Sequence, residues 1–148
     1  MNPVIRRYVK DDLEDLLEIV KKNTPQYFAP SEMEDLVQYL SLNIEDYFIM
    51  ELDGQLIGAG GINYELKNNI AKISWDFFDP TIQNKGYGSR LLQYRISLIR
   101  SNPAIDKILV RTSQFADGFY AKNGFKEISR HKDFWADGYD MVLMEFED

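Results

Sequence analysis

The order of its hydrophobic patterns predicts that this 148-residue chain folds as one α/β domain with a mixed sheet. Patterns typical of strands and of helices alternate, and hairpin patterns lie in the N-terminal half and at the C-terminal end. Between them, a strand over 70–78, a helix over 89–100 and a strand over 107–112 form one crossover unit. Because such crossovers connect parallel strands, we expect these two strands to be parallel neighbours.

In the N-terminal half, the pattern predicts a strand, two helices and a hairpin. An acidic first turn and leucines at helical spacing favour a helix over 11–22. Ser31, with Glu34 three positions later, is typical of a capping box at the start of a second helix. Asp53-Gly54 between two β-rich runs is typical of a tight hairpin turn. The expected elements are a strand over 3–9, helices over 11–22 and 31–42, and strands over 47–52 and 55–64.

In the C-terminal half, the crossover unit is followed by a short helix and a second hairpin. Asn102-Pro103 ends the crossover helix, and Asn123-Gly124 ends the next helix. The turn Ala136-Asp137-Gly138 separates the last two strands. The expected elements are strands over 70–78 and 107–112, helices over 89–100 and 115–122, and strands over 125–132 and 139–147.

Composition restricts the class of protein. Hydrophobic residues make up 45% and aromatic residues 14% of the chain, which indicates a packed core. The formal net charge of −7 argues against a nucleic-acid partner and favours a cationic second substrate. Without cysteine and with one histidine, His131, thiolate catalysis is excluded and no metal site is expected. No apolar run is long enough for a membrane helix, so we expect a cytoplasmic protein of one domain, residues 1–148.

The most informative segment, Gln83-Asn84-Lys85-Gly86-Tyr87-Gly88-Ser89, connects a predicted strand to a predicted helix. This geometry presents free backbone N–H groups and the positive end of a helix to an anion. Its two glycines allow phosphate oxygens to approach closely, and Lys85 and Arg90 add positive charge. We therefore expect a phosphorylated ligand here. The other glycine run, Gly58-Ala59-Gly60-Gly61, lies within a strand, which favours close packing rather than a dinucleotide site.

Two motifs resemble those of the GNAT N-acetyltransferase superfamily. The segment 83–88 fits the Gln/Arg-x-x-Gly-x-Gly/Ala signature, and 116–125 is similar to the family's Ala-x-x-x-Tyr-x-x-x-Gly-Phe segment. The resemblance implies a mostly antiparallel mixed sheet flanked by helices, with the two central parallel strands splayed to take acetyl-CoA. Pantetheine would lie along the end of the first splayed strand, and the pyrophosphate on the glycine turn. The implied cofactor-binding residues are Phe77, Phe78, Asp79, Gln83, Asn84, Lys85, Gly86, Tyr87, Gly88, Ser89 and Ser113, the last standing where many relatives have asparagine.

Tyr120, in the second motif, is the expected general acid. A phenol with an ordinary pKa near 10 is protonated at neutral pH and can protonate the thiolate that leaves when an amine attacks a thioester. Packing in the core is the alternative role. Many relatives carry a glutamate base where this chain has Lys72. The candidates here are Asp76, expected on the same strand face, Glu65 on the preceding strand, or water. A backbone N–H near Phe78 would hold the oxyanion.

Two groups of aromatic residues flank the acceptor site in folds of this kind. They are Tyr27 and Phe28 in the first interhelical loop, and Phe134, Trp135 and Tyr139 at the final hairpin. An acceptor pocket and a homodimer contact are both open interpretations. The predicted function is direct transfer of acetyl from acetyl-CoA to a primary amine of a small molecule or protein. The alternatives are a non-catalytic acyl-CoA-binding or protein-interaction module and a nucleotide-binding protein.

Overall fold

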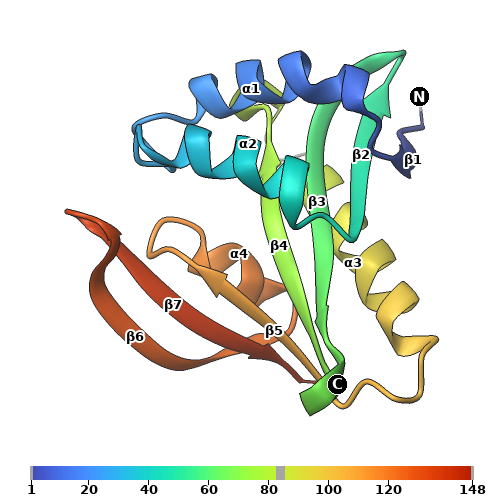
Figure 1. Ribbon diagram of the computed structural model, residues 1–148, viewed down its shortest axis with the longest axis vertical. Coiled ribbons are helices and arrows are strands. Elements are labelled where there is room, and N and C mark those ends of the chain that lie inside the picture. The colour runs from blue at the N-terminus through green and yellow to red at the C-terminus, as the bar shows by residue number, and fades with distance from the viewer. Residues whose placement is uncertain (1, 83–85, 148) are drawn as a thin grey trace.

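The computed structural model describes residues 2–82 and 86–147, which form a seven-stranded mixed sheet with helices on both faces (Figure 1). The strands are β1 (Val4–Arg7), β2 (Asp46–Leu52), β3 (Gln55–Glu65), β4 (Ile70–Phe78), β5 (Lys107–Thr112), β6 (Phe125–Ala136) and β7 (Tyr139–Phe146). The helices are α1 (Leu13–Lys22), α2 (Glu32–Leu42), α3 (Tyr87–Arg100) and α4 (Asp117–Lys122). The strand order is β1-β2-β3-β4-β5-β7-β6, and only β4 and β5 pair in parallel among the described strands. The predicted α/β fold is confirmed.

Apolar side chains hold the sheet between two helical layers. α1 and α2 cover one face, where Leu16 and Leu36 pack with Phe77 of β4. α3 and α4 cover the other face, where Leu92 packs in one cluster with Ile108 of β5. Each fully buried leucine contributes roughly 1.5–3 kcal/mol of transfer free energy, so both layers stabilise the position of the central strands.

β4 and β5 separate at their C-terminal ends, as Figure 1 shows at the centre of the molecule. Their parallel register runs from the pair Ile70↔Lys107 to the pair Ile73↔Val110 and stops there. β4 continues alone to Phe78 on this side, whereas β5 stays paired with β7 up to Thr112. The backbone along one edge of β4 therefore borders an opening, where an extended ligand with amide groups can pair with it.

A bulge in β4 changes which side chains face this opening. Gly60 of β3 lies opposite two residues, Trp75 and Asp76, and Trp75 has a φ of 45°. The extra residue reverses the alternation, so Trp75 packs with the α1–α2 layer while Asp76 contacts α3 and α4. Ile73 belongs to the α3–α4 layer, which puts Lys72 on the other face. The prediction that Lys72 and Asp76 share a face is wrong, because the period of two fails across a bulge.

Two glycines of β3 let large side chains support the bulge from both faces. A Cβ atom on Gly60 would lie 2.6 Å from Nη1 of Arg95, and one on Gly61 would lie 2.5 Å from Cδ1 of Tyr47. Arg95 comes from α3, whereas Tyr47 packs in the α1–α2 layer and donates its hydroxyl hydrogen to the carbonyl of Trp75 at 2.8 Å. The predicted packing role of this glycine run is confirmed.

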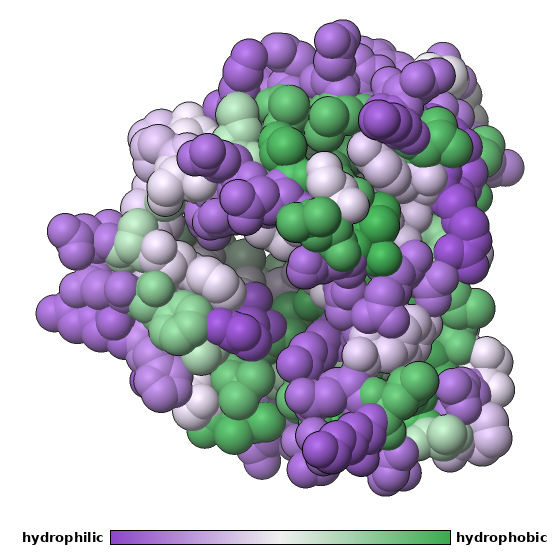
Figure 2. All heavy atoms as spheres, viewed as in Figure 1, coloured by the Kyte–Doolittle hydropathy of each residue, from purple (hydrophilic) through white to green (hydrophobic). Residues whose placement is uncertain are grey.

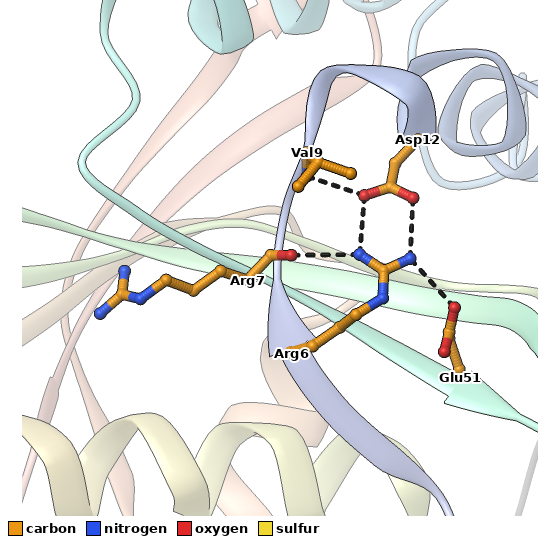
Figure 3. A network of polar contacts seen from close by, with 5 residues as sticks. All are labelled: Arg6, Arg7, Val9, Asp12 and Glu51. Carbon is orange, nitrogen blue, oxygen red and sulfur yellow. Dashed lines mark hydrogen bonds and ion pairs between the residues drawn. The ribbon is translucent and has the colours of Figure 1, made fainter.

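A polar network fixes the four-residue edge strand β1 against α1 and β2 (Figure 3). Arg6 donates to the two carboxylate oxygens of Asp12 at 2.9 and 2.8 Å, and to Glu51 at 3.0 Å. The backbone N–H of Val9 also donates to Asp12, at 2.8 Å. The hydrogen bonds from Arg6 are the largest cause that holds the pKa of Asp12 below its ordinary value. Asp12 therefore contributes stability in its ionised form.

The start of α2 differs from the predicted capping box. Ser31 occupies the N-cap position, but its side chain makes no capping hydrogen bond. The carboxylate of Glu32 instead accepts a hydrogen bond from the backbone N–H of Ala29 at 2.7 Å. The prediction of a box between Ser31 and Glu34 is wrong, because Ser31 has a helical backbone (φ −71°, ψ −17°), whereas a capping serine is usually extended.

Candidate active site

Two cavities open from the gap between β4 and β5 and meet there. The larger, of about 570 Å³, extends along the end of β4 to the start of α3. The smaller, of about 350 Å³, lies between α2 and the strands β4, β5 and β7. Figure 2 shows a hollow below α2, at the place where β4 and β5 separate in Figure 1. The residues that line both cavities are Tyr27, Phe28, Asp76, Ala116 and Tyr120.

Tyr120 enters this junction from α4 and is 4% exposed. Its hydroxyl donates a hydrogen bond to Oδ2 of Asp76 at 2.9 Å. Burial raises the pKa of Tyr120 well above its ordinary value, and the charge of Asp76 raises it further. The phenol is therefore protonated at neutral pH, which an acid role requires.

Arg95 contacts Asp76 from the α3 side. The arginine side chain is fully buried, and its Nη2 lies 2.8 Å from Oδ2 of Asp76, whose side chain is 7% exposed. Nη1 donates to the carbonyl of Gly61 at 3.1 Å, and Nε donates to the carbonyl of Leu91 at 3.2 Å. Nη2 has no aligned hydrogen-bond acceptor among the described residues, so its contact with Asp76 is an ion pair. Oδ2 of Asp76 is thus shared between Arg95 and Tyr120.

No sequence motif marks Arg95 as a site residue, although the position of this arginine on its helix is informative. It lies on the apolar stripe of α3, four residues from both Leu91 and Ile99. A charged residue on such a stripe must be paired where it is buried. The pattern predicts that a partner exists but not which element supplies it.

The start of α3 lines the larger cavity. The helix begins at Tyr87, two residues before the expected start, and Gly86 occupies the N-cap position with a φ of 76°. The N–H groups of a first helical turn have no partner within the helix, so they are available to an anion. Gly88 also packs closely, because a Cβ there would lie 3.3 Å from the ring of Phe119. Ser89 completes this wall.

The end of β4 forms another wall of the larger cavity. The N–H of Asp79 donates to the carbonyl of Ile57 in β3 at 2.8 Å, so this residue pairs toward β3. The backbone carbonyl of Phe78 points away from β3 and accepts a hydrogen bond from Nδ2 of Asn23 at 3.0 Å. Strand alternation places the N–H of Phe78 on the same open edge. Asn23, buried at the end of α1, is a contact that no sequence signal indicates.

Charged side chains at the same cavity divide into paired and available groups. The carboxylate of Asp79 accepts hydrogen bonds from the N–H and hydroxyl of Thr81 at 2.9 and 2.7 Å, and from Lys22 at 2.9 Å. Partial burial would raise the pKa of Asp79, but these donors outweigh burial and lower it. Lys122 of α4 also lines the cavity and brings a positive charge that the motifs do not reveal.

The remaining predicted cofactor-binding residues and candidate bases do not all line the larger cavity. Gln83, Asn84 and Lys85 lie outside the described residues, so their phosphate contacts stay predictions. Ser113 lines the smaller cavity rather than the larger, and its hydroxyl accepts a hydrogen bond from the N–H of Phe115 at 3.3 Å. Glu65 lines neither cavity, whereas Lys72 lines the smaller.

Four of the five aromatic residues expected in the two loops beside the acceptor site line a cavity, and Phe134 lines neither. Tyr27 and Phe28 line both cavities, and Trp135 and Tyr139 line the smaller. The hydroxyl of Tyr139 donates to the carbonyl of Pro25, which joins the β6–β7 hairpin to the α1–α2 loop. The acceptor-pocket and homodimer interpretations both stay predictions.

Neither a membrane-spanning helix nor a metal-ligand cluster is present in residues 2–82 and 86–147. The described helices are too short or too polar to cross a bilayer, and no three His, Cys, Asp or Glu side chains there could hold a metal ion together.

A family model matches almost the whole fold. Residues 14–147 match the model of the acetyltransferase (GNAT) domain, which spans the chain from α1 to β7. The chain belongs to the GNAT acetyltransferase family. The resemblance predicted from the glycine turn and the Tyr120 motif is therefore confirmed.

Known GNAT proteins show how far the similarity extends. An amino-acid acetyltransferase of Neisseria meningitidis serogroup A is 26% identical over 114 residues, which cover 72% of this chain and 26% of that protein. The chain thus spans about a quarter of the length of the curated relatives it matches. A Desulfovibrio desulfuricans structure described as a GNAT-family acetyltransferase has a TM-score of 0.81 at 18% identity, over 99% of both chains. An aminoglycoside 6'-N-acetyltransferase complexed with coenzyme A has a TM-score of 0.75 at 12% identity, over 96% of this chain and 95% of that chain. These structural likenesses show the fold.

Proposed function

We propose that this GNAT-family protein transfers an acetyl group from acetyl-CoA to a primary amine by direct attack. The observation that carries the proposal is the hydrogen bond between Tyr120 and Asp76 at the junction of the two cavities. A group that can give a proton and a group that can take one therefore lie side by side. Their position is where an acetyl donor in one cavity would meet an amine in the other.

The larger cavity has features that suit acetyl-CoA. The open-edge N–H of Phe78 can bind a pantetheine amide or the thioester oxygen, and the first turn of α3 offers N–H groups to the pyrophosphate. Lys122 adds a positive charge. The aminoglycoside acetyltransferase of the same fold is complexed with coenzyme A, which supports the same donor here. Acetyl-CoA supplies the activated thioester carbonyl.

Asp76 and Tyr120 can move the protons that acetyl transfer requires. Asp76 accepts a proton from the amine as nitrogen attacks, while the N–H of Phe78 stabilises the developing oxyanion. Tyr120 then gives its proton to the departing sulfur, and the proton on Asp76 passes to the phenolate. The net result moves one proton from nitrogen to sulfur. Protonation of Asp76 also weakens its hydrogen bond with the Tyr120 hydroxyl, because a neutral carboxyl group is a weaker acceptor than a carboxylate.

A non-catalytic acyl-CoA-binding module is the second candidate. The observation that favours it is Arg95, because an aspartate paired with a fully buried arginine can have a purely structural role, which is to join α3, α4 and β4. In that case Tyr120 would be a core residue. The two functions share the larger cavity and differ in whether the Tyr120 proton is used.

Replacing Tyr120 with phenylalanine separates the two candidates. The assay is release of free thiol from acetyl-CoA across a panel of primary amines. We expect kcat to fall roughly 10²–10⁴-fold, with the Kd for acetyl-CoA nearly unchanged. Tyr94→Phe, at an exposed tyrosine of α3 that lines neither cavity, is the matched control and should retain activity.

Turnover by Tyr120→Phe at the wild-type rate overturns the acid role. No thiol release by the wild type with any amine favours the binding module. The melting temperature does not discriminate, because loss of the buried Tyr120–Asp76 hydrogen bond costs about 1 kcal/mol under either function.

A further inference from the structure

The smaller cavity carries opposite charges that acetyl transfer alone does not require. Glu32 of α2 is half-buried, and its carboxylate accepts a hydrogen bond from the N–H of Ala29 at 2.7 Å. Arg111 of β5 places its guanidinium carbon 4.9 Å from the ring centre of Phe134 and 5.3 Å from that of Trp135. Glu32, Arg111 and Asp76 all line this cavity. A ligand here would meet both signs of charge.

Arg111 is held in place without a carboxylate partner among the described residues. The platform beneath it is fixed, because the indole N–H of Trp135 donates to the carbonyl of Thr112 at 3.2 Å. Stacking on aromatic rings leaves the guanidinium N–H groups available for a planar anion. The other cation of the cavity, Lys72, already lies 3.9 Å from Glu65.

The strand register brings Arg111 close to the reacting pair. Val110 and Ile73 are the last paired residues of β5 and β4, so Arg111 lies one residue beyond this pair and Asp76 three. Both residues therefore lie where β4 and β5 separate, and both line the smaller cavity. The two charged groups of one small molecule in this cavity can therefore contact both residues.

We propose that Arg111 anchors a carboxylate of the acceptor, and that the acceptor is a small zwitterion, a free amino acid whose amine lies beside Asp76. Glu32 attracts the ammonium form of that amine as it enters the cavity, and the ammonium releases one proton to water before the neutral amine attacks. The proposal rests on the proposed acetyl transfer and specifies the acceptor class. An amine with the same side chain but no carboxylate keeps the contact with Asp76 and loses the anchor.

The test compares matched acceptors in the thiol-release assay. The pairs are L-phenylalanine with phenethylamine, L-leucine with 3-methylbutylamine, and L-lysine with cadaverine. We expect at least one amino acid to exceed its amine in kcat/KM by roughly 10–100-fold, as charge-assisted hydrogen bonds provide. Arg111→Met should remove that preference with little change for the amine, and Arg111→Lys should restore part of it. Arg130→Met, on β6 and lining neither cavity, is the matched control.

Equal use of all amino acids and their amines overturns the anchor, as does a preference that survives Arg111→Met. Calorimetric titration of the CoA-saturated protein with the same six compounds separates this outcome from failure of the proposed catalysis. Amino-acid binding that Arg111→Met removes, without thiol release by the wild type, supports the anchor and overturns the catalysis. Absence of both binding and thiol release overturns both proposals.

Discussion

Replacing Arg95 with methionine removes the cationic partner of Asp76 and keeps an apolar chain in its place. Arg95 is fully buried and the Asp76 side chain is 7% exposed, so water cannot replace the lost charge without opening the core. Breaking a buried ion pair from one side costs about 3–5 kcal/mol. The carbonyl of Gly61 also loses a donor. We expect the free energy of unfolding to fall by about 3–5 kcal/mol and the melting temperature by roughly 6–20 °C.

Urea unfolding followed by circular dichroism measures this loss. Arg90→Met, at an exposed arginine of the same helix, is the matched control and should change the free energy of unfolding by less than about 0.5 kcal/mol. The double variant Arg95→Met/Asp76→Asn separates charge from packing. Because it removes the unpaired charge as well, it should be more stable than Arg95→Met by about 1 kcal/mol or more.

The dependence of Asp76 on Arg95 is refuted if Arg95→Met lowers the free energy of unfolding by less than about 1 kcal/mol. It is also refuted if the loss in the double variant equals the sum of the losses in Arg95→Met and Asp76→Asn. Either result would show that Asp76 does not depend on Arg95 for its charge balance. Because Asp76 also holds the Tyr120 hydroxyl, we expect Arg95→Met to lower kcat in the thiol-release assay. An unchanged kcat in a folded variant would mean that the position of Asp76 is set by the bulge alone.

Three other perturbations test the remaining parts of the structure. Gly60→Ala should cost about 1–3 kcal/mol in thermal unfolding, because its methyl group would lie 2.6 Å from Nη1 of Arg95, whereas Gly118→Ala, with nothing within 4 Å, should change stability by less than about 1 kcal/mol. Asp12→Asn should cost about 1–3 kcal/mol at pH 7 in urea unfolding. Since the folded pKa of Asp12 lies below its unfolded value, its contribution is complete above about pH 4 and is lost as pH falls through the folded pKa, so the difference from wild type should close in acid. Acetyl-CoA at a hundred times its Kd should raise the free energy of unfolding by about 2.7 kcal/mol and the melting temperature by roughly 5–10 °C; Lys122→Met should require more ligand for the same shift, and no wild-type shift at millimolar acetyl-CoA would contradict the cofactor proposal.

Local signals in the chain were enough to predict the order of the elements and the position of the glycine turn. Asp53 and Gly54 have φ values of 53° and 77°, as the predicted tight hairpin turn requires. Gly86 has a φ of 76° at the start of α3, where glycine is strongly favoured. Tyr120 was predicted as the general acid from its motif; it lies at the junction of the cavities, and its role stays a prediction. The turns depend on a few neighbouring residues, so local propensity is sufficient to reveal them, whereas the family resemblance of its segment indicated Tyr120.

The partners of Asp76 could not be predicted in the same way, because they come together only when distant elements pack. The bulge that turns Asp76 toward α3 depends on Gly60 of β3 and on Tyr47 of β2, and neither is its neighbour in the chain. The apolar stripe of α3 predicts that Arg95 needs a partner, yet any carboxylate within reach would satisfy it. In the sequence, Arg111 looks like an ordinary strand residue, and only the tertiary structure places the Trp135 ring beneath its guanidinium group. Side-chain alternation is a local rule, whereas a buried charge is paired by whatever group the tertiary packing brings within a few ångströms.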